Sequence, residues 1–274
     1  MTLFDRFRYD GKRVVVVGGA TGMGAATAEL ALDAGAEVVV MDFAQVELAG
    51  VKAIHLNLAD KASIEQAVDE CGGPMHALFA CAGVADGTAG IERINFIGHR
   101  HLIDRAIARG MLGRGSAIGF ISSAAGLAWR SNLAPLVEYL DVTDFDAASV
   151  WARDHGMANY MHSKQAICAY VAREAMSLLK RGIRINAVCP GPTDTPLAQA
   201  NKEMWLGFGA DYRAEVGIEP ATSLEQAYPL VFLCSDAASG ISGITLISDA
   251  GYLSSGITES FPAATPVAKF FLAI

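Results

Sequence analysis

The sequence has 274 residues, of which 52% are hydrophobic and only 18% charged, and its formal net charge is −8. This composition excludes a disordered chain, favours one globular domain over 1–274, and offers no basic surface for nucleic acid or an anionic membrane. No apolar stretch reaches the ~20 residues that span a bilayer, and the first eight residues lack the apolar core of a secretory signal.

A glycine-rich turn follows the first predicted strand. That strand, 13–17, ends in four valines, which is typical of a strand buried on both faces, and a helical pattern covers 22–34. The turn between them contains Gly18, Thr21, Gly22, Met23 and Gly24. Glycines let the backbone approach a diphosphate, whose charge the free N–H groups of a helix N-terminus stabilise. The turn therefore predicts a dinucleotide site, with an ordinary βα turn as the less favoured alternative.

Asp42 ends the second predicted strand, 37–41. It lies at the distance from the glycines at which a carboxylate accepts hydrogen bonds from the adenosine ribose hydroxyls. A carboxylate there repels a 2′-phosphate, and neither Thr21 nor Phe43 supplies a compensating cation. The pattern favours NAD over NADP, unless Asp42 is a plain turn residue.

Strand-like runs alternate with helical patterns almost to the end of the chain. The strands are expected at 13–17, 37–41, 52–56, 75–81, 116–121, 183–189 and 243–248, and the helices at 22–34, 61–70, 90–109, 158–181 and 223–235. This alternation predicts an α/β, Rossmann-type doubly wound fold, with a seven-stranded parallel sheet and helices on both faces. The ligand is expected at the carboxyl ends of the strands. Two stretches, 127–159 and 196–220, do not fit the alternation.

Tyr160 and Lys164 stand four positions apart at the start of the predicted helix 158–181. On a helix such residues lie one above the other, about 5–6 Å apart at Cβ. An ammonium beside a phenol favours the phenolate and lowers its pKa from about 10, which suits proton transfer. Alone, such a pair is more often part of a solvated helix face, and the glycine-rich turn is what favours the catalytic interpretation.

Five cysteines lie in apolar segments without metal-ligand spacing: Cys71, Cys81, Cys168, Cys189 and Cys234. Their odd number, with none in a CxxC pair, fits reduced thiols in a cytosol. No cluster of His, Cys and carboxylates has the spacing of a metal site. We therefore expect a cytoplasmic protein without a bound metal ion.

From roughly residue 11 to 251, these motifs in this order resemble the short-chain dehydrogenase/reductase family. Gly18, Gly22 and Gly24 match its glycine motif, although Val17 replaces the usual preceding Thr. The resemblance implies further cofactor contacts from Asn57 and Leu58, from Cys81, Ala82 and Gly83, and from Pro190, Gly191, Thr193 and Thr195, beside Thr21, Met23 and Phe43. Ala80-Cys81 stands where the family usually has Asn-Asn, which weakens side-chain bonding around that turn.

The resemblance also implies the catalytic residues. Ser123 matches the catalytic Ser that donates to the substrate oxygen, and Tyr160 and Lys164 match the catalytic pair, which also contacts the cofactor. Asn95 matches the helical Asn that holds a water for proton relay, although an Asn inside a helix can simply bond locally. The expected reaction transfers hydride between NAD and a secondary alcohol or ketone.

The spacing of these residues is similar to that of one branch of the family. Gly83 and Asn95 are 12 positions apart, and Ser123 and Tyr160 are 37 apart. A shortened middle followed by an insertion at 127–159 resembles the bacterial 3α-hydroxysteroid dehydrogenase/carbonyl reductase branch, in which the insertion changes the subunit interface. We expect a homodimer or a homotetramer.

Apolar side chains in both irregular stretches favour a bulky substrate, such as a steroid, terpenoid or aromatic alcohol. They are Trp129, Leu133 and Trp151 in the insertion, and Met204, Trp205, Leu206 and Phe208 in 196–220, which we expect to act as a lid. Packing in the core or at a subunit interface is an equally good explanation. The apolar tail 252–274 is expected to dock on its own subunit or on a partner.

Two other functions compete with a dehydrogenase. One is a non-catalytic NAD-binding redox sensor or scaffold, which has no need for the intact Ser123, Tyr160 and Lys164. The other is a nucleotide-sugar epimerase or dehydratase, which the glycine spacing and the short C-terminal part disfavour.

Overall fold

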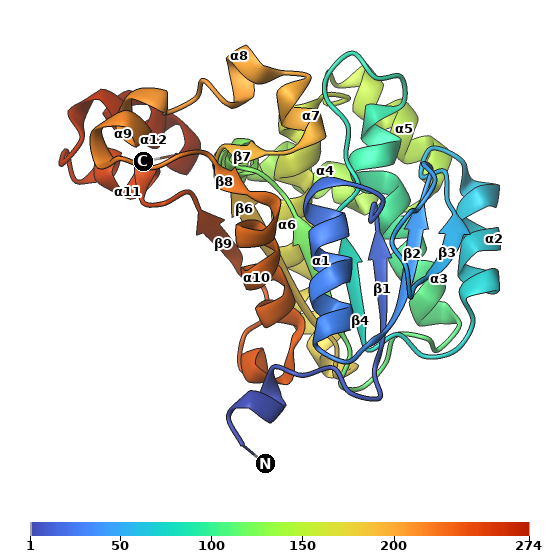
Figure 1. The fold of residues 1–274 in the computed structure, drawn as a ribbon. Coiled ribbons are helices and arrows are strands. Elements are labelled where there is room, and N and C mark those ends of the chain that lie inside the picture. Colours follow the sequence, from blue (N-terminus) through green and yellow to red (C-terminus); the bar gives the residue numbers. More distant parts are fainter. Residues whose placement is uncertain (1, 274) are drawn as a thin grey trace.

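The computed structural model describes residues 2–273 and shows a parallel sheet lying between two layers of helices (Figure 1). The strand order is β3-β2-β1-β4-β5-β6-β9, and all neighbouring pairs are parallel. The strands are β1 (Arg13–Val17), β2 (Glu37–Asp42), β3 (Lys52–His55), β4 (Ala77–Ala80), β5 (Ala117–Ile121), β6 (Arg184–Pro190) and β9 (Thr245–Ser248). The predicted seven-stranded, doubly wound fold is confirmed.

The long helices cover both faces of this sheet. They are α1 (Gly22–Asp33), α2 (Lys61–Cys71), α3 (Gly98–Ala108), α6 (Tyr160–Lys180) and α10 (Ser223–Cys234). Successive side chains of a strand point to opposite faces, so Val15 packs in the core beneath α2, α3 and α6, and Val14 in the core beneath α1 and α10. Within residues 2–273, no helix combines the length and apolarity needed to cross a membrane.

The predicted helix 90–109 has an irregular first half. Within that half, the segment η2 (Arg93–Ile97) is π-helical and runs directly into α3. A π-helical turn bonds five residues apart instead of four, which widens the helix locally. Other short helices are η1 (Phe4–Arg6), η3 (Ala124–Arg130) and η4 (Asp236–Ala238).

The insertion forms two helices that belong to the core. They are α4 (Leu133–Asp141) and α5 (Phe145–Asp154), and the Asp144 side chain caps α5 by accepting from two backbone N–H groups. Leu136, Tyr139 and Phe145 are almost fully buried and join the cluster beneath α2, α3 and α6.

The segment 196–220 and the tail lie near each other, beyond the strand ends (Figure 1). The first contains α7 (Pro196–Gln199), α8 (Lys202–Trp205) and α9 (Ala210–Val216), flanked by the short strands β7 (Thr193–Asp194) and β8 (Ala221–Thr222). The tail forms α11 (Tyr252–Ile257), η5 (Pro262–Ala264) and α12 (Thr265–Leu272). Ala264 and Ala268 are fully buried, and the Phe271 ring lies 5.7 Å from that of Phe208, so the tail docks on its own chain.

If the insertion is part of the core, Leu136→Ala should lower the free energy of unfolding by about 2–5 kcal/mol, because it leaves a cavity at a fully buried position. The matched variant Leu133→Ala, on the exposed side of α4, should change it by no more than about 0.5 kcal/mol. Denaturant unfolding measures both. Equal, small effects would contradict this packing.

Candidate active site

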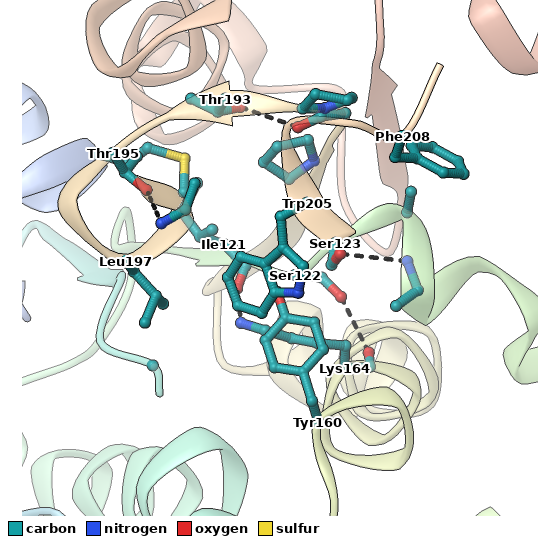
Figure 2. A pocket seen from close by; sticks show the side chains of 18 of the residues that line it. Ile121, Ser122, Ser123, Tyr160, Lys164, Thr193, Thr195, Leu197, Trp205 and Phe208 are labelled. Atoms are coloured by element: carbon teal, nitrogen blue, oxygen red, sulfur yellow. Dashed lines mark hydrogen bonds between the residues drawn. The ribbon is translucent and has the colours of Figure 1, made fainter. Parts of the chain in front are cut away.

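A cavity of about 330 Å³ lies where three central strands end (Figure 2). Cys81 follows β4, Ser123 lies just beyond β5, and Pro190 is the last residue of β6, and all three line the cavity. Tyr160 and Lys164, on the first two turns of α6, line it as well. The structure therefore brings the three predicted catalytic side chains to one cavity at the predicted end of the sheet.

Two hydrogen bonds fasten the start of α6 to the end of β5. The Lys164 Nζ donates to the carbonyl oxygen of Ile121 at 2.9 Å, and the Ser122 hydroxyl donates to the carbonyl oxygen of Lys164, also at 2.9 Å. Because Ser123 follows Ser122 and Tyr160 lies one turn before Lys164, these bonds set the two hydroxyl-bearing side chains against the same cavity.

Burial shifts the pKa values of Tyr160 and Lys164 in opposite directions. It raises the pKa of Tyr160 to about 12, although the Ser123 hydroxyl nearby opposes the rise. It lowers the pKa of Lys164 to about 8, because a buried ammonium loses its hydration. The Lys164 Nζ lies 5.5 Å from the centre of the Tyr160 ring. The expected lowering of the phenol pKa by the ammonium is not seen here, and desolvation raises the pKa of Tyr160 instead.

Asn95, in η2, is fully buried and does not line the cavity. Its Oδ1 accepts from the Val84 N–H at 2.8 Å, and its Nδ2 donates to the Val84 carbonyl at 3.0 Å and to the Ser163 hydroxyl at 3.2 Å. The amide thus joins the loop after β4 to α6. The relay role stays a prediction. The side chain does not bond locally within its own helix, because its partners Val84 and Ser163 lie on other segments.

The glycine turn packs so closely that Gly18 and Gly24 have no room for a side chain. Gly18 has a φ of +83°, and a Cβ there would lie 2.4 Å from the Cα of Ala82. A Cβ on Gly24 would lie 1.9 Å from the Gly18 carbonyl oxygen. Asp42 fastens the turn from β2, because its Oδ2 accepts from the Ala20 N–H at 2.8 Å. This bare backbone, beside a carboxylate at a strand end, fits a dinucleotide.

Most other predicted cofactor residues lie along the same edge. Those that line the cavity are Met23, Cys81, Gly83, Pro190, Gly191, Thr193 and Thr195. Gly22 adjoins Thr195, because a Cβ on Gly22 would meet the Thr195 Cβ at 3.6 Å. Phe43, Asn57 and Leu58 lie outside the cavity, with Phe43 exposed beside His55 and Leu58 buried.

Two polar residues near the cavity were not predicted from the sequence. The Asp86 Oδ1 accepts from the Tyr160 N–H at 2.7 Å, and Asp86 lines the cavity. The buried His99 Nε2 donates to the Ala82 carbonyl at 3.0 Å, and burial lowers the pKa of His99 to about 4, which keeps it neutral. No motif singles out an acid in a loop or a histidine within a helix.

The apolar wall of the cavity comes from 196–220 and the tail. Met204, Trp205 and Phe208 line it as predicted, together with Leu197 and Phe271. The Trp205 ring lies 4.9 Å from that of Tyr160 (Figure 2).

The insertion, in contrast, contributes nothing to the cavity wall. Of the two explanations left open for Trp129, Leu133 and Trp151, lining the substrate cavity is wrong, because none of the three lines it. Trp151 stacks between Tyr139 and His155, Leu133 is exposed, and Trp129 packs against the core, because α4 and α5 fold against α6 and η2. Leu206 is buried without lining the cavity.

Comparison with known proteins gives three informative matches. A family model described as enoyl-(acyl carrier protein) reductase matches residues 138–253. Short-chain dehydrogenase reductase 5 of Arabidopsis thaliana is 32% identical over 89% of this chain and 95% of that protein. The 3-alpha-hydroxysteroid dehydrogenase/carbonyl reductase of Comamonas testosteroni is 29% identical over 87% of this chain and 95% of that protein.

A solved structure is similar over almost the whole chain. It is the 3-alpha-hydroxysteroid dehydrogenase from Pseudomonas sp. B-0831, in complex with NADH. The sequence identity is 28% and the TM-score 0.72, over 91% of this chain and 99% of that one. The fold is therefore shared with a protein of known structure.

The depressed pKa of Lys164 predicts a pH-dependent stability difference between the protein and Lys164→Met. Between about pH 8 and 10.5, Lys164 holds a proton in the unfolded chain but not in the folded protein. The free energy of unfolding therefore rises with pH across this window, and the Lys164→Met variant lacks this rise. The wild type should gain up to about 3 kcal/mol relative to the variant across this window. Unfolding free energies of both proteins at pH 7 to 10.5 check this. A constant difference would mean that the amine is not desolvated.

Proposed function

The chain belongs to the short-chain dehydrogenase/reductase family, and we propose that it is an NAD-dependent oxidoreductase that interconverts a secondary alcohol and a ketone. The observation that carries this proposal is the meeting of Ser123, Tyr160 and Lys164 at one cavity beside a glycine turn that fits a dinucleotide. A protein that only senses or binds the nucleotide needs no such set of side chains.

The three side chains divide the chemistry at the substrate oxygen. A bound nicotinamide supplies the hydride acceptor or donor. Tyr160 exchanges the proton with the substrate oxygen, and its raised pKa favours the protonated phenol that ketone reduction requires. Ser123 donates a hydrogen bond to the same oxygen and stabilises negative charge that develops there.

Lys164 supports Tyr160 through its charge. In oxidation the phenol must first lose its proton, and an ammonium whose Nζ lies 5.5 Å from the ring centre favours the phenolate. The attraction is stronger in this buried site than in water, because the effective dielectric is lower. The hydrogen bond to the Ile121 carbonyl holds the amine in place for this role.

Asp42 supports NAD rather than NADP. Its carboxylate ends β2 and accepts from the Ala20 and Ala44 N–H groups, which fixes it beside the glycine turn. A ribose diol can donate to the carboxylate's remaining lone pairs, while a 2′-phosphate meets a like charge. The next residue, Phe43, is exposed and offers no cation.

The walls of the cavity support a bulky, largely apolar substrate. Met204, Trp205 and Phe208 face it from a segment that closes over Tyr160. Steroid, terpenoid and aryl alcohols fit this chemistry, and two of the similar proteins are named for a hydroxysteroid. A panel of these alcohols with NAD, followed by the absorbance of the reduced nicotinamide, identifies the class.

Tyr160→Phe should lower kcat at least about a hundredfold with any active substrate, because it removes the group that exchanges the proton. The Kd for NAD should change little. Tyr170→Phe is the matched control, since it removes a hydroxyl from the same helix outside the cavity and should retain turnover. Undiminished turnover in Tyr160→Phe would remove this residue from its role.

Asp42→Asn and Asp42→Ala test the cofactor preference. Asn keeps one oxygen acceptor, for the Ala20 N–H, and loses the charge together with the acceptor for the Ala44 N–H. It should therefore narrow the difference in KM between NADP and NAD while the bond to the glycine turn is kept. Ala should in addition raise the KM for NAD about tenfold or more, because a hydrogen bond to a charged group is lost. A wild type that already prefers NADP contradicts the assignment.

A further inference from the structure

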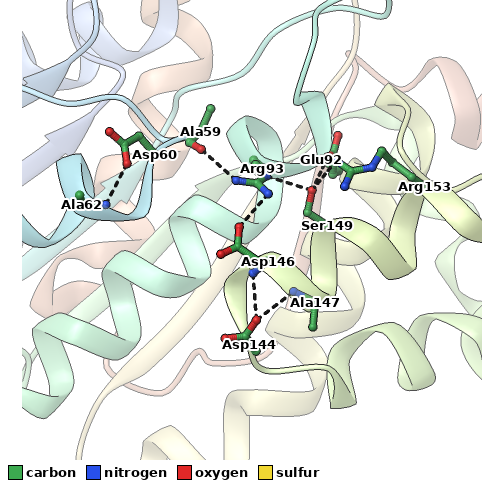
Figure 3. A network of polar contacts seen from close by, with 10 residues as sticks. All are labelled: Ala59, Asp60, Ala62, Glu92, Arg93, Asp144, Asp146, Ala147, Ser149 and Arg153. Carbon is green, nitrogen blue, oxygen red and sulfur yellow. Dashed lines mark hydrogen bonds and ion pairs between the residues drawn. The ribbon is translucent and has the colours of Figure 1, made fainter.

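A polar network centred on the buried Glu92 and Ser149 joins the insertion to the π-helical turn, as Figure 3 shows. Glu92, directly before η2, is 3% exposed, and its Oε1 accepts from the Ser149 hydroxyl at 2.6 Å and from Arg153 at 3.1 Å. Arg93, the first residue of η2, donates to Ser149 at 2.9 Å and to Asp146 at 2.8 Å. The three partners from the insertion all lie on α5.

A second arginine also joins this helical region to the insertion, from α3, which continues directly from η2. Arg100, on α3, is 4% exposed, and its Nη2 donates to the Val142 carbonyl at 2.7 Å, in the turn between α4 and α5. The Arg93 Nη1 also reaches the Ala59 carbonyl at 3.4 Å, ahead of α2. The π-helical turn is therefore held from both sides, by the insertion and by the segment after β3.

Asn95 lies on this π-helical turn, two residues after Arg93. The Asn95 amide holds both backbone groups of Val84 and reaches the Ser163 hydroxyl, which itself donates to the Tyr160 carbonyl at 2.7 Å. Val84 follows Gly83 at the cavity edge. A shift of η2 would therefore displace the loop after β4 relative to the helix that carries Tyr160.

Stability alone does not account for charges in this position. Asp146 is largely exposed, so its ion pair with Arg93 contributes little to stability. An apolar contact sets no direction, whereas the three donors of Arg93 address fixed oxygens on two segments. π-Helical turns also occur frequently at functional sites.

We propose that Arg93 is a positioning residue through which the insertion 127–159 fixes Asn95, and with it the loop after β4, against the helix of Tyr160. The proposal deepens the proposed function, because the expected loss of turnover presumes the reaction described above. It assigns to the insertion a role inside its own subunit.

Arg93→Met should lower kcat roughly ten- to a hundredfold, because a displacement of about 1 Å at a site costs that much. The KM for NAD should change far less. Arg93→Lys keeps one charge and should recover part of the loss. Arg109→Met is the matched control, because Arg109 lies just after α3 and its side chain pairs with the exposed Asp69 on the surface, so turnover should be unchanged.

A double variant separates positioning from general weakening of the fold. If Arg93 acts through Asn95, Arg93→Met combined with Asn95→Ala should lose no more turnover than Asn95→Ala alone. Losses that multiply, or a full kcat in Arg93→Met, overturn the proposal.

Hydrogen exchange at the Val84 N–H tests the positioning role without any substrate. Because Asn95 accepts from this group, its exchange should speed up in Arg93→Met as in Asn95→Ala, and stay slow in Arg109→Met. Unchanged exchange in Arg93→Met overturns the proposal even if turnover falls. A wild type without turnover on the alcohol panel refutes the proposed function instead, and the exchange result still decides the positioning role.

Discussion

The whole site depends on the junction between the end of β5 and the first turns of α6. The buried Lys164 amine donates to the Ile121 carbonyl, and the Ser122 hydroxyl donates to the Lys164 carbonyl. A lysine is rarely this deeply buried, because its ammonium loses hydration. These two bonds hold it at the cavity, and they set Ser123 and Tyr160 on the same wall.

Polar contacts also place the other segments around this junction. Asp42 fastens the glycine turn, His99 holds the Ala82 carbonyl, and the Asn95 amide holds Val84. Each contact is a buried or half-buried side chain that reaches a backbone group across the strand ends. Apolar packing places the sheet and its helices, and these directed bonds then fix the loops that surround the reacting atoms.

The sequence predicted those features that local chemistry determines. Buried valine runs predicted the central strands, and glycines at 18, 22 and 24 predicted the tight turn, because bulkier residues cannot adopt it. The π-helical turn at Arg93–Ile97 has no periodicity that marks it, and Trp151 could equally line a cavity or a core. Burial raises the pKa of Tyr160, which was expected to be lowered, and it lowers the pKa of Lys164. Burial depends on the packing of distant segments, which the local sequence does not show.

The most direct test of the central claim follows one atom. Secondary alcohols that carry deuterium on the carbinol carbon are incubated with NAD and the protein, and the nicotinamide is analysed by NMR. If Ser123, Tyr160 and Lys164 form a dehydrogenase site, deuterium from an accepted alcohol appears at C4 of the nicotinamide. NAD that binds in the presence of the whole panel and never acquires deuterium would contradict the account.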